Sequence, residues 1–305
     1  NSLAFVAALA LGALVYDAAT LQGLLRGLGW DVALDPRTTM RFPLYLTLIT
    51  ALGAWWAALG MTEPGGRPAR AGGLLASILA ASRLTLDAGR WILTTPLAVA
   101  VILGGMLLDH LCRLFVTLNS TYFRLIGLPD ASFGLIGAGI ALLGVAIARL
   151  APALGRRSPR FNFALLALSC LLGLAGAALV LPFGLGLLPV VLLHAVMLLT
   201  GFLVSHYLNA VTDSARRATV LSFKGLAFNL GYGALGLLYA GSLALLRERA
   251  GAPVSEAAIF QFSLPWLLGY GIIACLLFVA FVAAWMPAGW STRLEENPER
   301  PTASS

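Results

Sequence analysis

The sequence predicts an all-α polytopic membrane protein with about eight transmembrane helices. Hydrophobic residues make up 59% of the chain and charged residues only 11%, and the mean hydropathy is +0.89. This composition lies well outside the range of soluble globular domains. The apolar residues form separate runs of about 20 residues, which is the length that a helix needs to cross the hydrocarbon core. Because lipid offers no hydrogen-bond partners to an irregular backbone, each run is expected to be an α-helix.

Eight runs of this kind follow one another along the chain. They lie at residues 3–25, 42–61, 92–118, 132–150, 162–182, 188–208, 222–246 and 262–286. The connection at 62–91 is longer than the others and begins with a Glu-Pro-Gly-Gly sequence, which breaks a helix. Within it, Leu75, Leu79 and Leu86 recur at helical spacing, which predicts a short amphipathic helix on the membrane surface. A loosely ordered linker is the alternative.

The basic residues indicate which ends of the spans face the cytoplasm. Arg216 and Arg217 lie between two apolar runs, and Lys224, the only lysine in the chain, lies at the start of the second run; all three are expected on the cytoplasmic side. If the spans alternate from that point, thirteen basic residues fall inside and six outside, with Arg113 within a span. We therefore expect an integral protein of the bacterial cytoplasmic (inner) membrane, with both ends of this chain in the cytoplasm. Membrane topology accounts for the net charge of +7, so no nucleic-acid partner is expected.

The residue types that carry most enzyme chemistry are not grouped in this sequence. Cys112, Cys170 and Cys275 occur singly within apolar runs and are interpreted as small core residues. No Ser-His-Asp, metal-ligand or phosphate-loop spacing occurs, so we expect neither an enzyme, nor a metal, nor a cofactor.

The chain begins at Asn1 without an initiator Met, which suggests a truncated start.

One stretch resembles a known family. The sequence Asp-Ser-Ala-Arg-Arg-Ala-Thr-Val-Leu-Ser, beginning at Asp213 and followed by a helix with Gly and Asn, resembles the loop between helices 10 and 11 of major facilitator superfamily (MFS) transporters. Such proteins join two six-helix halves by a long cytoplasmic loop. The resemblance implies that this chain is the C-terminal two thirds of an N-terminally truncated MFS transporter.

The same resemblance assigns a role to each part of the chain. It makes residues 1–61 the last two helices of the N-terminal bundle, 62–91 the cytoplasmic inter-bundle loop, 92–287 a complete C-terminal six-helix bundle and 288–305 a cytoplasmic tail. It also implies a monomer that moves a small solute by alternating access, as a symporter or antiporter coupled to a proton or another cation. Cytoplasmic gating loops would contain Arg156, Arg157, Asp213, Arg216 and Arg217. The first of these loops keeps only Gly-Arg-Arg of the family's Asp-Arg-bearing motif, and a plain positive-inside cluster is the alternative there.

The run at 92–118 is followed directly by polar residues and contains several itself. At 100° per residue, Asp109, Arg113, Thr117 and Ser120 project from one side and His110 from a neighbouring side, and Asn119 is also a candidate. A polar stripe at this depth normally faces a bundle interior or a water-filled path. Asp109 is therefore predicted to be a proton or cation site, with Arg113 as its partner or as an anchor for a substrate anion. The alternative is an ion pair between residues i and i+4 that only neutralises itself.

The run at 222–246 carries a second group of candidates. Asn229 and Tyr232 are candidate substrate contacts, because a buried amide needs a partner. Gly225, Gly233 and Gly236 are predicted to let a neighbouring helix approach closely. His194, among Leu and Val in the run at 188–208, is interpreted as a packing residue.

Two other functional classes compete with transport. A membrane-embedded enzyme acting on lipid-like substrates would need acidic or His clusters at an interface, which the connections between the runs lack. A transport-incompetent permease homologue acting as a sensor would be favoured by a soluble signalling domain.

Overall fold

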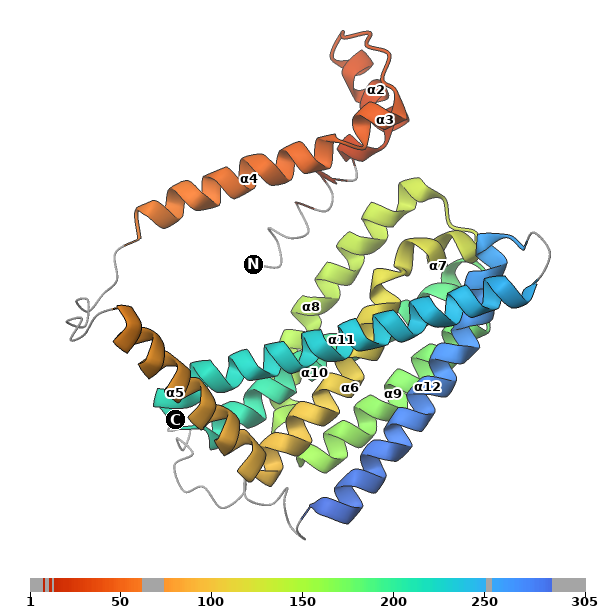
Figure 1. Cartoon of the computed structure of the whole chain (residues 1–305). Helices are drawn as coiled ribbons and strands as arrows, with labels where there is room; N and C mark the ends of the chain where they lie inside the picture. The colour runs from red at the N-terminus through yellow and green to blue at the C-terminus, as the bar shows by residue number, and fades with distance from the viewer. Residues whose placement is uncertain (1–7, 9–10, 13, 62–73, 251–253, 287–305) are drawn as a thin grey trace. The chain divides into compact units, whose positions relative to one another are not determined.

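The computed structural model describes residues 8, 11–12, 14–61, 74–250 and 254–286 (Figure 1). Over these ranges the chain forms α-helices and one short 3₁₀ turn, η1 (Asp130–Ser132), and no β-strand. Seven described helical segments are long and apolar enough to cross a membrane. The predicted fold class, an all-α polytopic membrane protein, is confirmed at this level.

The seven spanning segments correspond to the predicted runs from 42–61 onward. They are built from α4 (Phe42–Leu59), α6 (Pro96–Thr117), α8 (Phe133–Gly155), α9 (Pro159–Ala178), α10 (Phe183–Val211), α11 (Ser214–Ala250) and α12 (Glu256–Trp285). Local chemistry explains several of the starting points. Proline occupies the first turn of α4, α6 and α9, where its missing N–H is not needed. The hydroxyls of Ser158 and Ser255 accept hydrogen bonds from the first turns of α9 and α12.

The predicted run at 3–25 lies partly outside the described residues. In its described part the helical backbone stops at Asp17, which precedes α2 (Ala18–Gly27). The Asp17 carboxylate accepts hydrogen bonds from the backbone N–H and the hydroxyl of Thr20. Asp17 therefore acts as a helix N-cap, and a continuous span over 3–25 stays a prediction.

The chain divides into two compact units. The first comprises Asn1–Ile78 and Leu128–Val145, and the second comprises Leu79–Gly127 and Ala146–Ser305. In the first unit, the short helix α3 (Pro36–Thr39) packs against the start of α4. No residue of α4 is buried, and its apolar side chains are exposed, as on a helix that faces lipid.

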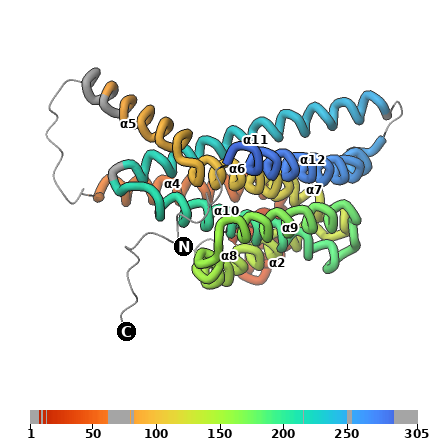
Figure 2. The backbone as a smooth tube through the Cα atoms, turned by 90° about the horizontal axis from the view of Figure 1, so that it is seen from below, coloured from red at the N-terminus to blue at the C-terminus, as the bar shows by residue number. Residues whose placement is uncertain are grey.

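In the second unit, α6 is the central helix. It packs against α9, α10, α11 and α12, and Figure 2 shows α11 on one side of α6 and α9 on the other. Fifteen residues of α6 are buried, whereas the outer faces of the surrounding helices expose many Leu and Ile side chains. Helix α8 belongs to this unit only from Ala146 onward. The complete six-helix bundle at 92–287 and the other domain boundaries therefore stay predictions.

The predicted run at 92–118 is divided in the structure. Its first residues, up to Thr94, form the end of helix α5 (Leu74–Thr94), Thr95 has extended backbone angles, and Pro96 begins α6. At the other end, α6 stops at Thr117 and the short helix α7 (Asn119–Leu125) follows. Because α6 ends there, Asn119 and Ser120 do not continue the polar stripe as a single helix would place them. Residues 74–94 are helical, and the position on the membrane surface stays a prediction.

Close packing around α6 depends on glycines other than those predicted. A Cβ added at Gly105 of α6 would lie 2.5 Å from Val204 of α10 and 2.9 Å from Phe228 of α11. A Cβ added at Gly231 of α11 would lie 2.7 Å from Met106 of α6. By contrast, the space beside Gly225, Gly233 and Gly236 is open within 4 Å. The prediction that these three glycines allow close approach is wrong, because the side of α11 that meets α6 is set by Gly231.

Candidate functional site

An ion pair lies inside the second unit, on the central helix. Arg113 Nη2 donates a hydrogen bond to Asp109 Oδ1 at 3.0 Å and lies 2.7 Å from Asp109 Oδ2. The two residues are one helical turn apart on α6, which explains why their side chains meet. Asp109 is almost completely buried, whereas one third of the Arg113 side chain is exposed. The guanidinium therefore covers the carboxylate and reaches outward from it.

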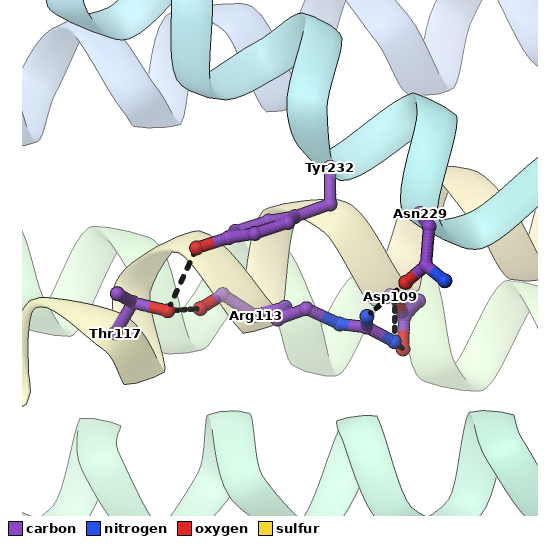
Figure 3. A network of polar contacts seen from close by, with 5 residues as sticks. All are labelled: Asp109, Arg113, Thr117, Asn229 and Tyr232. Atoms are coloured by element: carbon purple, nitrogen blue, oxygen red, sulfur yellow. Dashed lines mark hydrogen bonds and ion pairs between the residues drawn. The ribbon is translucent and has the colours of Figure 1, made fainter.

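Helix α11 completes the network that Figure 3 shows. Arg113 Nη1 donates to Asn229 Oδ1 at 2.9 Å, and the Arg113 guanidinium lies 5.7 Å from the centre of the Tyr232 ring. The Thr117 hydroxyl donates to the Arg113 carbonyl at 2.8 Å and lies 3.2 Å from the Tyr232 hydroxyl. The structure thus brings together five candidates that were predicted from two separate runs: Asp109, Arg113, Thr117, Asn229 and Tyr232.

A second cation lies close to this network and was not predicted as a site residue. Lys224 of α11 donates a hydrogen bond to the Ser205 hydroxyl of α10 at 2.9 Å, and Ser205 donates in turn to the Gly201 carbonyl at 2.8 Å. Lys224 is half-buried, lies 5.5 Å from the centre of the Phe228 ring, and acts electrostatically on Asp109. The sequence feature that could have identified Lys224 as a site residue is that it is the only lysine and lies next to an apolar run. From the sequence it was instead predicted to lie in a cytoplasmic turn.

The turn around Asp213 is shorter than predicted. Helix α11 begins at Ser214, so Arg216 and Arg217 lie in its first turn, and Lys224 lies about 12 Å beyond Arg216 along the helix axis. The prediction of a charged turn extending from Asp213 to Lys224 is therefore wrong. The backbone N–H groups of Arg216 and Arg217 both donate to the Asp213 carbonyl at 3.1 Å, as in the first turn of a helix. The helix begins this early because it can continue past the apolar core into water.

His110 forms a separate contact beside the network. Its Nε2 lies 3.1 Å from the Tyr270 hydroxyl of α12, and the Tyr270 ring stacks on Trp266. His110 is buried. It therefore joins α6 to α12, whereas Asp109 and Arg113 face α11.

The two candidates on α7 are not part of the network. Asn119 Nδ2 lies 3.5 Å from His194 Nε2 of α10, and His194 Nδ1 lies 2.8 Å from the Val190 carbonyl. Both ring nitrogens of His194 thus have contacts within the protein, as expected of a packing histidine. Ser120 is exposed.

The predicted gating loop at Arg156 and Arg157 is the turn between α8 and α9. Both arginines are exposed. The Tyr207 hydroxyl of α10 donates to the Arg157 carbonyl at 3.2 Å, and Asn162 of α9 donates to the Leu154 carbonyl at 2.6 Å and to Tyr207. Asn162 and Tyr207 thus hold this turn against the end of α10. Sequence reasoning missed Asn162, although an amide that follows a basic turn at the start of an apolar run was visible.

The three cysteines are free thiols, and those of Cys112 and Cys170 share a hydrogen bond. Cys112 of α6 and Cys170 of α9 are buried with their sulfur atoms 3.7 Å apart, and Cys275 of α12 is partly exposed. All three lie within spanning helices, as small residues that pack between helices do.

Apolar helices packed around a buried ion pair define a polytopic helical membrane protein with a polar centre between α6 and α11. An ionisable pair at this depth is costly unless its partners satisfy it, and such groups mark solute or ion paths in membrane proteins. No protein-family model, no curated protein and no solved structure matches this chain.

Proposed function

We infer that the chain is part of a secondary active transporter of the major facilitator type, which moves a small solute across the membrane by alternating access and couples this movement to a proton or another cation. The observation that carries this proposal is the network of Asp109, Arg113, Asn229 and Tyr232. It joins a buried carboxylate to partly exposed polar groups on a second helix. Through Arg113, which is one-third exposed, the buried carboxylate is connected to groups that a solute could reach.

The electrostatics of the network suit coupling. Asp109 is the buried anion, and the cations that act on it are Arg113 on its own helix and Lys224 on α11. Because Arg113 is the direct charge partner of Asp109, protonation of Asp109 would leave the guanidinium without that partner. Arg113 could then bind an anionic group of a solute instead, and release of the proton would favour the original pair. Occupancy by a proton and by a solute would in this way be linked through one guanidinium.

Alternating access can be tested without knowing the solute. Gly233 lies one turn beyond Asn229 on α11 and has open space beside it, so Gly233→Cys should fold normally. With the native cysteines replaced by Ala, a membrane-impermeant thiol reagent should label this position from either side of a proteoliposome. A position that faces lipid should not react with a charged reagent from either side. That result, in a protein that folds normally, would contradict the proposal.

The role of Asp109 is tested in the same background. If Asp109 exchanges protons, the labelling rate at Gly233→Cys should change with pH by more than the ionisation of the thiol itself causes, and Asp109→Asn should leave only the pH dependence of the thiol. Asn keeps the size and the hydrogen-bonding oxygen of the side chain while removing its charge. A pH dependence that is identical with and without the carboxylate would mean that Asp109 is not the coupling group.

A further inference from the structure

A cavity of about 610 Å³ lies in the second unit, on a different face of α6 from the polar network. Its walls include Leu107 and Leu108 of α6, Phe163 and Ala167 of α9, and Phe278 and Val282 of α12. At 100° per residue, Leu107 and Leu108 project at least 100° away from Asp109. The cavity is therefore separate from the site described above, and its volume is that of an ordinary ligand pocket.

Small side chains create this space. Ala164 and Ala167 on α9 and Ala283 on α12 lie along the cavity, where larger residues would fill it. Gly104 on α6 also lines it, and a Cβ there would lie 2.8 Å from the Phe278 ring and 3.1 Å from the Phe163 ring. The two rings can thus approach α6 at one end of the cavity while the alanines keep the rest open.

The charge of the cavity is confined to one end. Of the residues that line it, Arg160 alone is charged, and it lies in the first turn of α9. Arg156 and Arg157 precede it in the exposed turn between α8 and α9. The cavity runs inward from Arg160 to Ala167, about 10 Å along the α9 axis. It therefore combines a basic mouth with an apolar interior, which fits an amphiphile that has an anionic head and a hydrocarbon chain.

We propose that this cavity binds an anionic phospholipid, with the phosphate at Arg160 and part of one acyl chain between α6, α9 and α12. A lipid is the occupant favoured by the setting, because the cavity lies among membrane-spanning helices and its mouth is at a helix end, where headgroups lie. The basic turn is also expected on the cytoplasmic side, the side on which basic pockets between helices bind anionic headgroups. The proposal does not depend on transport.

The test compares two lipids that differ in head charge. The purified protein in detergent is mixed with equal amounts of phosphatidylglycerol and phosphatidylcholine, and bound lipid is measured by native mass spectrometry. The wild-type protein should retain phosphatidylglycerol in preference. Arg160→Gln should weaken phosphatidylglycerol binding by about fivefold, the effect of one basic residue at a headgroup, and leave phosphatidylcholine binding unchanged. Ala167→Phe should reduce the binding of both lipids by filling the cavity.

Matched variants control for general effects. Arg249→Gln removes an exposed arginine near the C-terminal end of α11, a helix that does not line the cavity. Leu168→Phe enlarges an exposed α9 side chain that does not line the cavity. Both should bind phosphatidylglycerol as the wild type does. Equal phosphatidylglycerol binding by the wild type, Arg160→Gln and Ala167→Phe would overturn the proposal. Displacement of phosphatidylglycerol by oleate at equal concentration would assign the cavity to a fatty acid and overturn it as well.

Discussion

At the scale of single residues, the two members of the central ion pair are not equivalent. The Asp109 side chain is 6% exposed and the Arg113 side chain is 34% exposed. Loss of Arg113 would leave a buried carboxylate with only Lys224 to compensate it. Loss of the Asp109 charge would leave a guanidinium that still contacts Asn229 and can reach water. An uncompensated buried charge is the costlier of the two results.

We therefore predict that Arg113→Gln lowers the free energy of unfolding by about 3 kcal/mol, as expected when a buried pair loses one partner. Asp109→Asn should cost less, because Arg113 keeps its other contacts. The double variant should be more stable than Arg113→Gln alone, since no buried charge remains without a partner. Unfolding of the four proteins by denaturant in the same detergent measures these differences. Equal losses from the two single changes would show that exposure does not decide the cost.

At the scale of helices, the contact between α6 and α11 determines whether the polar network can form. Gly231 of α11 faces Met106 of α6, while Asn229 and Tyr232 on the same helix reach Arg113 and Thr117. The close approach at Gly231 brings these polar groups within hydrogen-bonding distance. Without a hydrophobic effect between helices in lipid, such contacts depend on small residues.

Gly231→Leu should therefore separate α11 from α6 and lower both the folded yield and the thermal stability. Gly233→Leu is the matched control, because the same side chain there enters open space. Size-exclusion chromatography and thermal unfolding in detergent compare the two variants with the wild type. If Gly233→Leu proved the more damaging change, the side of α11 that faces α6 would have been assigned incorrectly.

At the scale of the whole molecule, the ends of α11 mark two sides of the membrane. The turn before α11, at Asp213, follows α10, whose Tyr207 bonds to the Arg157 carbonyl. The turns at Arg157 and Asp213 therefore lie at the same end of the helices. Arg249 lies at the other end of α11, about 50 Å away along the axis. This distance exceeds the thickness of the hydrocarbon core, about 30 Å.

A topology reporter inserted after Arg157 should therefore be cytoplasmic, and one inserted after Arg249 should be external. The excess of basic residues on the predicted inner side sets this direction. Alkaline phosphatase and green fluorescent protein fusions, which are active on opposite sides of a bacterial inner membrane, measure it. Activity of the same reporter at both positions would contradict the three spans, α9, α10 and α11, between them, and a reversed pattern would contradict the orientation.

The sequence by itself determined the apolar helices, because a run that must satisfy its own backbone in lipid has few alternatives to a helix. The predicted runs from 42–61 onward correspond to described helices, with ends displaced by up to eight residues. Where charged residues flank a run, as at Arg216, the helix extended further than the apolar pattern. Helical periodicity also placed Asp109 and Arg113 on one side of α6, since their spacing is local to one helix.

Only the tertiary structure decided which helices meet, because that depends on side chains far apart in the sequence. It selected Gly231 rather than Gly233 for the contact with α6, brought Asn229 and Tyr232 to Arg113, and left Ser120 outside the network. It also opened a cavity beside Ala167, between α6, α9 and α12. Periodicity gives the direction of a side chain from its own helix, whereas the partner it meets is set by how closely the neighbouring backbones can approach.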